Sequence, residues 1–145
     1  MPKIEVSKTI NADRKKAFDI IKAMERFPEF MRDVKNVKIL ERANGRIITQ
    51  RKTDIDGVPI EWTEEDTFNN KDFCCRFKSI KGEYKYDGIW KVADDGKDRV
   101  KVLISVNFDW EIPELEKFIG PTLEKKARIS LRSMLNAIKK KAENE

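Results

Sequence analysis

The sequence predicts an α+β fold in which a curved, seven-stranded antiparallel sheet wraps around a long C-terminal helix, with two short helices between the first two strands. In the closing segment, apolar residues recur at intervals of three and four, as on one face of a helix. These residues are Leu123, Ala127, Leu131, Met134, Leu135, Ile138 and Ala142. Most of the remaining chain alternates apolar and polar residues, as half-buried strands do. So broad an apolar helix face needs a broad apolar partner, which a curved sheet supplies.

Length and composition indicate one globular domain spanning residues 1–145. The chain has 39% charged residues with both signs interspersed, and 39% hydrophobic residues, which favours a folded globule over disorder. No apolar run approaches the 18 residues of a membrane-spanning helix, and no signal-peptide pattern opens the chain. We therefore expect a cytoplasmic protein without a transmembrane segment. Its oligomeric state, monomer or homodimer, and transient contact with membranes stay open.

Several kinds of chemistry are excluded by residue type. The chain has no histidine, which removes His-based triads, imidazole bases and ordinary His-ligated zinc sites. Its two cysteines, Cys74 and Cys75, are neighbours in a predicted strand, so they point to opposite faces and cannot form a disulfide framework. We expect no metal site and no cofactor.

The first strands and helices are predicted from the spacing of apolar residues and from residues that break a helix. Alternation predicts a strand over residues 3–10, and helical spacing predicts a helix over 13–24. Pro28 breaks that helix before a short second turn that ends near Met31. Strands follow over 34–41 and 46–55, joined by a turn at Asn44 and Gly45.

The dipeptide Asp56-Gly57 predicts a two-residue hairpin turn, and this turn fixes a register. It pairs Arg51 with Trp62 and Thr49 with Glu64. The opposite face of the hairpin is wholly polar, so the face that carries Trp62 is predicted to point inward.

Later turns extend the same inner face. A turn near Asn69 and Asn70 keeps Phe73, Cys75 and Phe77 inside. A turn at Lys81 and Gly82 sets Tyr84 opposite Ser79, Tyr86 opposite Phe77, Gly88 opposite Cys75 and Trp90 opposite Phe73, with Arg76 and Asp87 paired outside.

The last hairpin needs an odd-length loop of three or five residues around Gly96, because only an odd loop keeps the valine-rich strand facing inward. This register pairs Trp90 with Val102. The strand is expected to end near Trp110, and Pro113 opens the closing segment. Gly120 and Pro121 break that segment before the main helix.

The order of these elements resembles that of the START-like helix-grip superfamily, also called SRPBCC. The stretch after the first strand contains Phe18, Ile21, Met24, Phe27-Pro28-Glu29-Phe30-Met31 and residues 37–41. These residues are similar to the polyketide cyclase/dehydrase and coenzyme Q-binding branch, although Phe27 stands where Tyr is commoner. The resemblance implies a deep cavity between sheet and helix for a lipid, quinone or polyketide-like molecule. It transfers no catalytic residue.

The register and the helix face together predict the side chains that meet such a ligand. They are Arg51, Trp62, Glu64, Phe77, Tyr84, Tyr86, Trp90, Ile104, Phe108, Ala127 and Leu131. The aromatic members suit either a plain core or a platform for a ligand. Gly88 and Ala127 would either leave space in the cavity or let the bent sheet approach the helix.

Ionisable groups are also predicted on this inner face. Arg51, Glu64 and Asp66 must pair, meet water or meet a ligand, because a buried unpaired charge is costly. Arg51 and Glu64 lie diagonally on adjacent strands and should pair. The pair is either a solvent-exposed salt bridge near the open end of the sheet, an anchor for a polar head group, or part of an acid/base site with Asp66 and a tyrosine.

Three functions therefore stay open. The first is binding or transport of a hydrophobic small molecule; the second is a cyclase/dehydrase-type enzyme. The third is a protein-interaction module with a filled cavity, whose active surface would be the basic face of the last helix. Seven Lys or Arg and one Glu lie between Glu124 and Lys141. This face is either a surface for anionic partners or a solvated helix face, and without a nucleic-acid motif we expect no nucleic acid.

Overall fold

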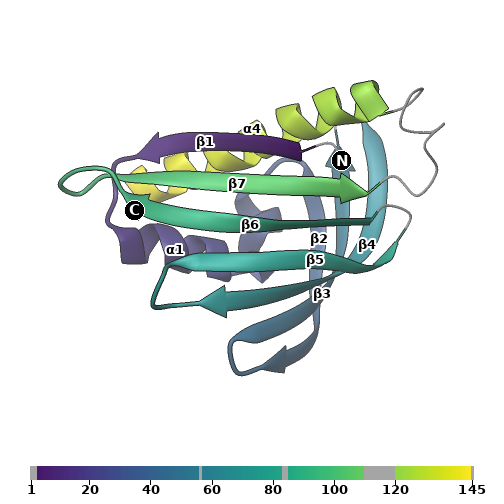
Figure 1. Cartoon of the computed structure of the whole chain (residues 1–145), viewed down its shortest axis with the longest axis horizontal. Helices are drawn as coiled ribbons and strands as arrows, with labels where there is room; N and C mark the ends of the chain where they lie inside the picture. The colour runs from purple at the N-terminus through teal and green to yellow at the C-terminus, as the bar shows by residue number, and fades with distance from the viewer. Residues whose placement is uncertain (1–2, 56, 83–84, 110–119, 145) are drawn as a thin grey trace.

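The computed structural model describes residues 3–55, 57–82, 85–109 and 120–144. The strands within these residues form one antiparallel sheet of seven strands, in the order β1-β7-β6-β5-β4-β3-β2. The sheet curves, and the long helix α4 lies against its concave side beside β1 (Figure 1). The predicted α+β fold is confirmed.

The elements follow the predicted order. The strands are β1 (Lys3–Ile10), β2 (Val34–Ala43), β3 (Arg46–Ile55), β4 (Val58–Asn69), β5 (Cys74–Gly82), β6 (Lys85–Asp94) and β7 (Val100–Asp109). The helical elements are α1 (Arg14–Lys22), the 3-10 turn η1 (Met24–Arg26), α2 (Phe27–Phe30) and α4 (Gly120–Asn144). The expected strand end near Trp110 and the segment opened by Pro113 lie outside the described residues.

The short helices begin and end at residues that the sequence marks. Asp13 caps α1, because its carboxylate accepts a hydrogen bond from the backbone N–H of Lys16 at 2.7 Å. Pro28 lies in the first turn of α2, where its missing N–H removes no helical hydrogen bond. Residues between β1 and β2 therefore pack as small helices at one end of the sheet.

The β3–β4 hairpin has the predicted register throughout. Arg51 lies opposite Trp62, Thr49 opposite Glu64, and Ile55 opposite Val58. Gly57 has a φ of 89°, the positive value that this tight turn requires and that glycine adopts without strain.

Two later hairpins differ from their predicted pairings by two residues. Tyr86 is not opposite Phe77: Phe77 pairs with Gly88, and Cys75 with Trp90. Arg76 pairs with Ile89 rather than with Asp87. The β6–β7 loop has five residues, an odd number as predicted, but it pairs Trp90 with Ile104 rather than with Val102. A shift of two residues keeps every side chain on its predicted face, because strand side chains alternate with a period of two.

The sequence predicted Phe73 within a strand, but in the structure it lies outside one. It ends the β4–β5 turn with a φ of 52°. Its ring packs edge-on against Phe18, with the ring centroids 5.6 Å apart, and the Arg14 guanidinium lies 4.4 Å from its centroid. The turn thereby fastens this corner of the sheet to α1.

Gly88 serves packing rather than cavity space. A Cβ atom at this position would lie 2.2 Å from the Ser105 carbonyl oxygen and 2.4 Å from the Phe77 ring. Phe77 is its partner across the strands, so its ring occupies the room that a side chain at position 88 would need.

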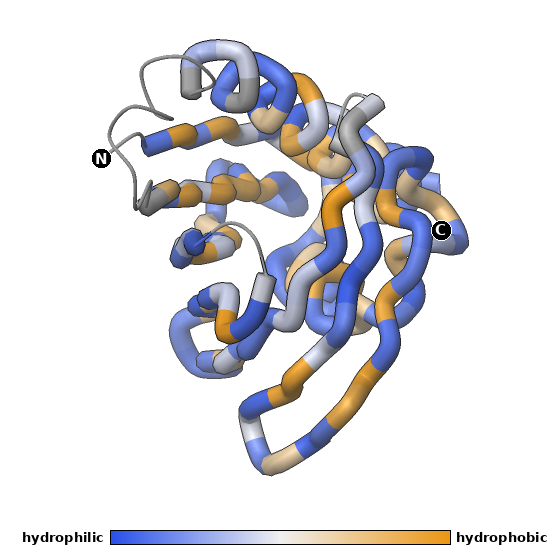
Figure 2. The backbone as a smooth tube through the Cα atoms, turned by 90° about the vertical axis from the view of Figure 1, so that its right-hand side faces the viewer, coloured by the Kyte–Doolittle hydropathy of each residue, from blue (hydrophilic) through white to orange (hydrophobic). Residues whose placement is uncertain are grey.

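The hydrophobic core lies where α1, η1 and the C-terminal half of α4 meet the sheet. Leu135, Ile138 and Ala142 of α4 are 0–1% exposed. They share this core with Phe18 and Met24, which are equally inaccessible. Figure 2 shows the alternation of hydrophobic and hydrophilic residues along the curved strands that face them.

Candidate functional site

A cavity lies between the N-terminal half of α4 and the concave side of the sheet, at the end away from α1. The space in which the centre of a water molecule fits has a volume of about 130 Å³. This is about ten times the minimum needed to hold one water molecule. The lining side chains are Val34, Arg51, Thr53, Ile60, Trp62, Glu64, Phe77, Tyr86, Trp90, Ile104, Val106, Phe108, Glu124, Ala127, Ser130, Leu131 and Met134.

Most of the cavity wall is apolar, and its aromatic rings pack against one another. The Tyr86 ring lies 5.9 Å from both the Trp62 ring and the Phe77 ring, and 6.2 Å from the Phe108 ring, measured between centroids. Such tilted and edge-on arrangements are the stable ones for aromatic pairs. The wall therefore consists of rings that pack against one another and present their faces and edges to the cavity.

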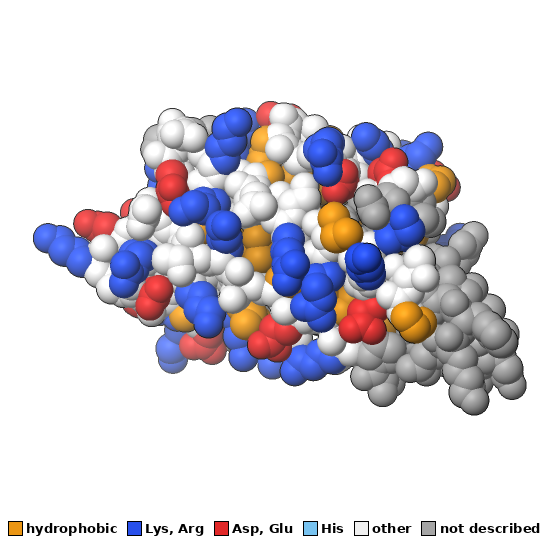
Figure 3. Space-filling model, turned by 90° about the horizontal axis from the view of Figure 1, so that it is seen from above, with side chains coloured by type: hydrophobic (Ala, Val, Ile, Leu, Met, Phe, Trp, Pro, Cys, Tyr) orange, Lys and Arg blue, Asp and Glu red, His pale blue; other side chains and the backbone are white. Residues whose placement is uncertain are grey.

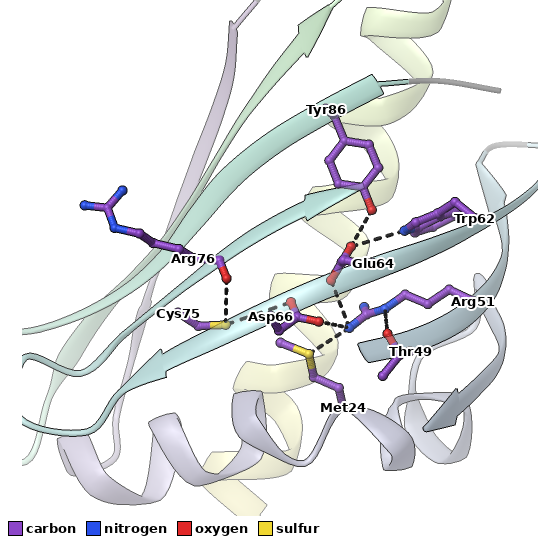
Figure 4. Close-up of polar contacts among 9 residues, drawn as sticks. All are labelled: Met24, Thr49, Arg51, Trp62, Glu64, Asp66, Cys75, Arg76 and Tyr86. Carbon is purple, nitrogen blue, oxygen red and sulfur yellow. Dashed lines mark hydrogen bonds and ion pairs between the residues drawn. The ribbon is translucent and has the colours of Figure 1, made fainter. Parts of the chain in front are cut away.

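One side of the cavity is charged. The Arg51 Nη2 atom lies 3.0 Å from a Glu64 carboxylate oxygen and 3.1 Å from one of Asp66. Trp62 donates its indole N–H at 3.2 Å to the other Glu64 oxygen, Oε1, and the Tyr86 hydroxyl donates a short hydrogen bond to this Oε1 atom as well. Figure 4 shows these side chains converging on Glu64 from β3, β4 and β6.

A second layer of residues holds Arg51 from behind. Arg51 donates its Nε–H to the Thr49 hydroxyl at 2.9 Å and an Nη2–H to the Met24 sulfur at 2.7 Å. Thr49 lies on β3 two residues away, whereas Met24 comes from η1. Neither residue lines the cavity, so they fix the guanidinium without contacting a ligand.

Burial and pairing set the charges of this cluster. Burial and the neighbouring Glu64 raise the pKa of Asp66 well above its usual value. For Glu64, burial alone would raise the pKa, but Arg51 and hydrogen bonds from Asp66, Tyr86 and Trp62 hold it below the usual value. For Arg51, the two carboxyl groups likewise outweigh burial and raise the pKa. The cluster thus holds Arg51 as a cation, Glu64 as an anion and Asp66 as a neutral acid.

The other titratable groups here stay protonated. Burial, with the charge of Glu64, raises the pKa of Tyr86 well above its usual value, so its hydroxyl remains a donor. Burial also raises the pKa of the Cys75 thiol, whose sulfur lies 3.9 Å from Asp66. Cys75 is therefore a buried thiol rather than a nucleophile.

Arg51 has hydrogen-bonding capacity left over. A guanidinium carries five N–H donors. The hydrogen bonds and ion pairs of Arg51 within the described part of the chain use Nε and Nη2, and Nη1 has none. Arg51 lines the cavity and is only 7% exposed. Its free donors are therefore available to an oxygen acceptor that enters the cavity.

The structure brings together ten of the eleven predicted ligand-contacting residues around this cavity, and Tyr84 lies outside the described residues. The predicted pairing of Arg51 with Glu64 is present. However, the pair is not a solvent-exposed salt bridge, because the Arg51 and Glu64 side chains are only 7% and 5% exposed.

Sequence reasoning missed three features of the cluster. They are the support of Arg51 by Met24, the hydrogen bond from Tyr86 to Glu64, and the contribution of Ser130 to the cavity wall. Ser130 follows Ala127 by three residues on the predicted apolar face of the helix, a spacing that could have identified it.

The basic face of α4 carries mixed charge rather than one positive patch. Arg128 pairs with Glu124 at 3.9 Å, and Lys139 forms a short ion pair with Glu143. Figure 3, which views the molecule from above, shows acidic side chains among the Lys and Arg side chains. This arrangement favours a solvated helix face.

Within the described ranges, no cluster of three or more His, Cys, Asp or Glu side chains could hold a metal ion. Nor is any helix within those residues long and apolar enough to cross a membrane.

Comparison with known proteins supports the fold. A family model described as "Polyketide cyclase / dehydrase and lipid transport" matches residues 10–135. TTHA0849 from Thermus thermophilus has a similar structure, with a TM-score of 0.89, 18% identity and coverage of 97% of each chain. The Zhui aromatase/cyclase from a Streptomyces species has a TM-score of 0.90 at 15% identity, with 98% of this chain and 93% of that chain covered.

Norcoclaurine synthase from Thalictrum flavum is also similar, with a TM-score of 0.79 and 17% identity over 99% of this chain and 87% of that chain. At such identities the likeness concerns the fold alone. No curated protein matches the sequence at a significant level.

Proposed function

Because the chain belongs to the polyketide cyclase/dehydrase and lipid transport family and has the START-like helix-grip fold, we propose that it binds or transports an amphipathic small molecule. The apolar body of this molecule fills the cavity between the sheet and α4, and one of its oxygen atoms accepts hydrogen bonds from Arg51. A lipid, a quinone or a polyketide-like compound has this combination of groups.

The observation that carries this proposal is the unused Nη1 group of Arg51. A buried donor without an acceptor costs about 1–3 kcal/mol. A ligand that brings an oxygen acceptor to this donor at the cavity wall removes the cost, and this favours binding. The ion pair with Glu64 holds the guanidinium in place, so little conformational entropy is lost when the ligand binds.

The open cavity also favours this function over that of an interaction module. Such a module would fill the space below α4 with its own side chains, whereas here the space is open and lined by aromatic rings. A rigid apolar cavity with a few convergent polar groups is typical of small-molecule sites.

A cyclase/dehydrase-type activity is the second candidate, and the neutral Asp66 favours it. Asp66 and Glu64 both contact the Arg51 guanidinium, and Glu64 lines the cavity beside the Tyr86 hydroxyl. The Glu64 carboxylate can take a proton from a ligand and give the same proton to a hydroxyl group of the ligand, which leaves as water. Asp66 can instead pass its proton to Glu64, which then acts as the acid while Asp66 becomes the carboxylate paired with Arg51. Such a relay would give the site an acid and a base at neutral pH.

Native mass spectrometry of the purified protein, followed by solvent extraction, tests the binding function. We expect a co-purified molecule with an apolar body and at least one oxygen acceptor, and we expect Arg51→Met to lose it. Arg46→Met is the matched control, because Arg46 lies on the same strand but pairs with Glu65 outside the cavity. Arg51→Lys keeps the charge but not the fork of donors, and it should also bind more weakly. Full retention of the molecule by both Arg51 variants would refute the proposal.

A further inference from the structure

Two buried hydroxyl groups at the cavity wall have no hydrogen-bond partner among the residues that the structure describes. Thr53 on β3 is 6% exposed and Ser130 on α4 is 4% exposed, and both line the cavity. The hydrogen bonds within the described part of the chain include neither hydroxyl, although they satisfy Thr49 on the same strand. Leaving a hydroxyl buried and unpaired costs about 1–3 kcal/mol.

The surroundings of these hydroxyls explain why they stay unpaired. Thr53 lies between Val34 and Ile60 in the sheet, and both neighbours have apolar side chains that also line the cavity. A helical serine ordinarily bonds to the carbonyl oxygen four residues earlier. Ser130 makes no such bond to Lys126, so its hydroxyl remains available to the cavity.

The position of Thr53 relative to Arg51 sets the distance between two points at which a ligand could form hydrogen bonds. Thr53 and Arg51 lie on the same face of β3, two residues apart, and therefore about 7 Å apart along the strand. The helix α4 contacts β3, and its Ser130 lines the same cavity. A rigid molecule held by Arg51 at one end would meet Thr53 further along β3, and Ser130 would approach it from α4.

We propose that Thr53 and Ser130 form a second hydrogen-bonding subsite, which selects ligands with polar oxygen atoms at two separated positions over ligands with a single polar head. This inference rests on the proposed binding function, since it assumes that Arg51 holds the first oxygen. It narrows the ligand class from any amphipathic molecule to compact, apolar ring compounds that carry oxygen at both ends. A simple lipid with a hydrocarbon tail would leave the second subsite unpaired.

The test compares two probes, 2-naphthol and 2,6-dihydroxynaphthalene, by isothermal titration calorimetry. The wild-type protein should bind the diol about fivefold more tightly than the mono-ol, the gain expected from one additional hydrogen bond. Thr53→Val and Ser130→Ala should each reduce this preference, because each should lower the affinity for the diol more than the affinity for 2-naphthol. Ser105→Ala is the control, because it removes a buried hydroxyl that does not line the cavity.

The outcomes separate this inference from the function on which it rests. If 2-naphthol binds in an Arg51-dependent manner but the diol gains nothing, the second subsite is refuted and the anchor stands. If neither probe binds, both proposals fail. Stability gives a ligand-independent readout, because removing an unpaired buried hydroxyl should leave the urea midpoint unchanged or raise it. A lowered midpoint for Thr53→Val would show that the hydroxyl has a structural partner and would overturn the assignment.

Discussion

Near α1, the space between α4 and the sheet is filled by side chains such as Leu135, Ile138 and Val92, which are 0–1% exposed. At the other end the same helix and strands enclose a cavity with Arg51, Glu64 and their hydrogen-bond partners at its wall. The strand β6 runs through both ends, because its Val92 lies in the filled end and its Tyr86 lies in the end with the cavity.

The difference shows how one sheet can combine stability with a binding site. The filled end buries apolar surface and contributes most of the hydrophobic stabilisation. The open end keeps charged and hydroxyl groups out of water. This costs free energy unless each group is paired or hydrogen-bonded. Variants in the two ends should therefore separate loss of stability from loss of binding.

The largest effect is expected from removing both acidic partners of Arg51. Glu64→Gln combined with Asp66→Asn leaves a buried guanidinium without a counter-charge and should lower the free energy of unfolding by about 4 kcal/mol. Glu64→Gln alone should cost less than half as much, because Asp66 can then release its proton and replace the lost charge. Urea unfolding measures both variants. Adding Arg51→Met to the double variant should restore most of the stability, and equal losses in the single and double variants would contradict this charge assignment.

A cavity-creating change in the filled end should cost nearly as much but spare binding. Ile138 is fully buried on α4, so Ile138→Ala should lower the free energy of unfolding by about 3 kcal/mol. The affinity for 2-naphthol should stay within twofold of the wild-type value when both are measured well below the melting temperature. A binding loss comparable to that of Arg51→Met would show that the two ends are coupled.

Removing the tyrosine hydroxyl should have a smaller effect within the open end. Tyr86→Phe keeps the ring that packs against Trp62 and Phe77 but removes one hydrogen bond to the Glu64 carboxylate. We expect a loss of about 1.5 kcal/mol, since Arg51 and Trp62 still bind the carboxylate. Thermal and urea unfolding should agree on this value, and an unchanged stability would mean that the hydroxyl does not bond to Glu64 in solution.

The smallest effect at a single step of a measurement is the change of stability per pH unit. Burial and Glu64 raise the pKa of Asp66 in the folded state, so the folded protein keeps a proton that the unfolded chain releases above about pH 3.9. The stabilisation by this group is complete below that pH and falls as the pH rises towards the folded-state pKa. Relative to Asp66→Asn, the wild-type protein should lose up to about 1.4 kcal/mol per pH unit within this window. Parallel pH profiles of the two proteins would show that Asp66 is ionised when folded.

The sequence predicted the site best where a local turn fixed the geometry. Asp56 and Gly57 allow a two-residue turn, and this sets the pairing of Arg51 with Trp62 and the diagonal approach of Glu64. The five-residue loop before Val100 carries no comparable signal of its length, so the pairing of Trp90 was predicted two residues away from its actual partner.

Contacts between elements that are distant in the chain could not be predicted from the sequence. Met24 reaches Arg51 from η1, 27 residues earlier in the chain, and no spacing rule connects them. The hydrogen bond from Tyr86 to Glu64 depends on how strongly the sheet curves. Curvature arises from the twist and packing of all the strands together, so no single pattern of residues encodes it.

The exposed edges of the sheet bear on how the protein behaves at high concentration. Strand β1 is one edge, and side chains of α4 cap its outer carbonyl groups: Arg128 donates to Glu5 and Lys139 donates to Thr9. Strand β2 is the other edge, and its pairing with β3 is interrupted by two irregularities. Capped carbonyls and bulges both discourage a second chain from adding its own strand. The curved sheet, whose two edge strands stay unpaired with each other and so leave room for the cavity, is thereby protected from growing into a fibril.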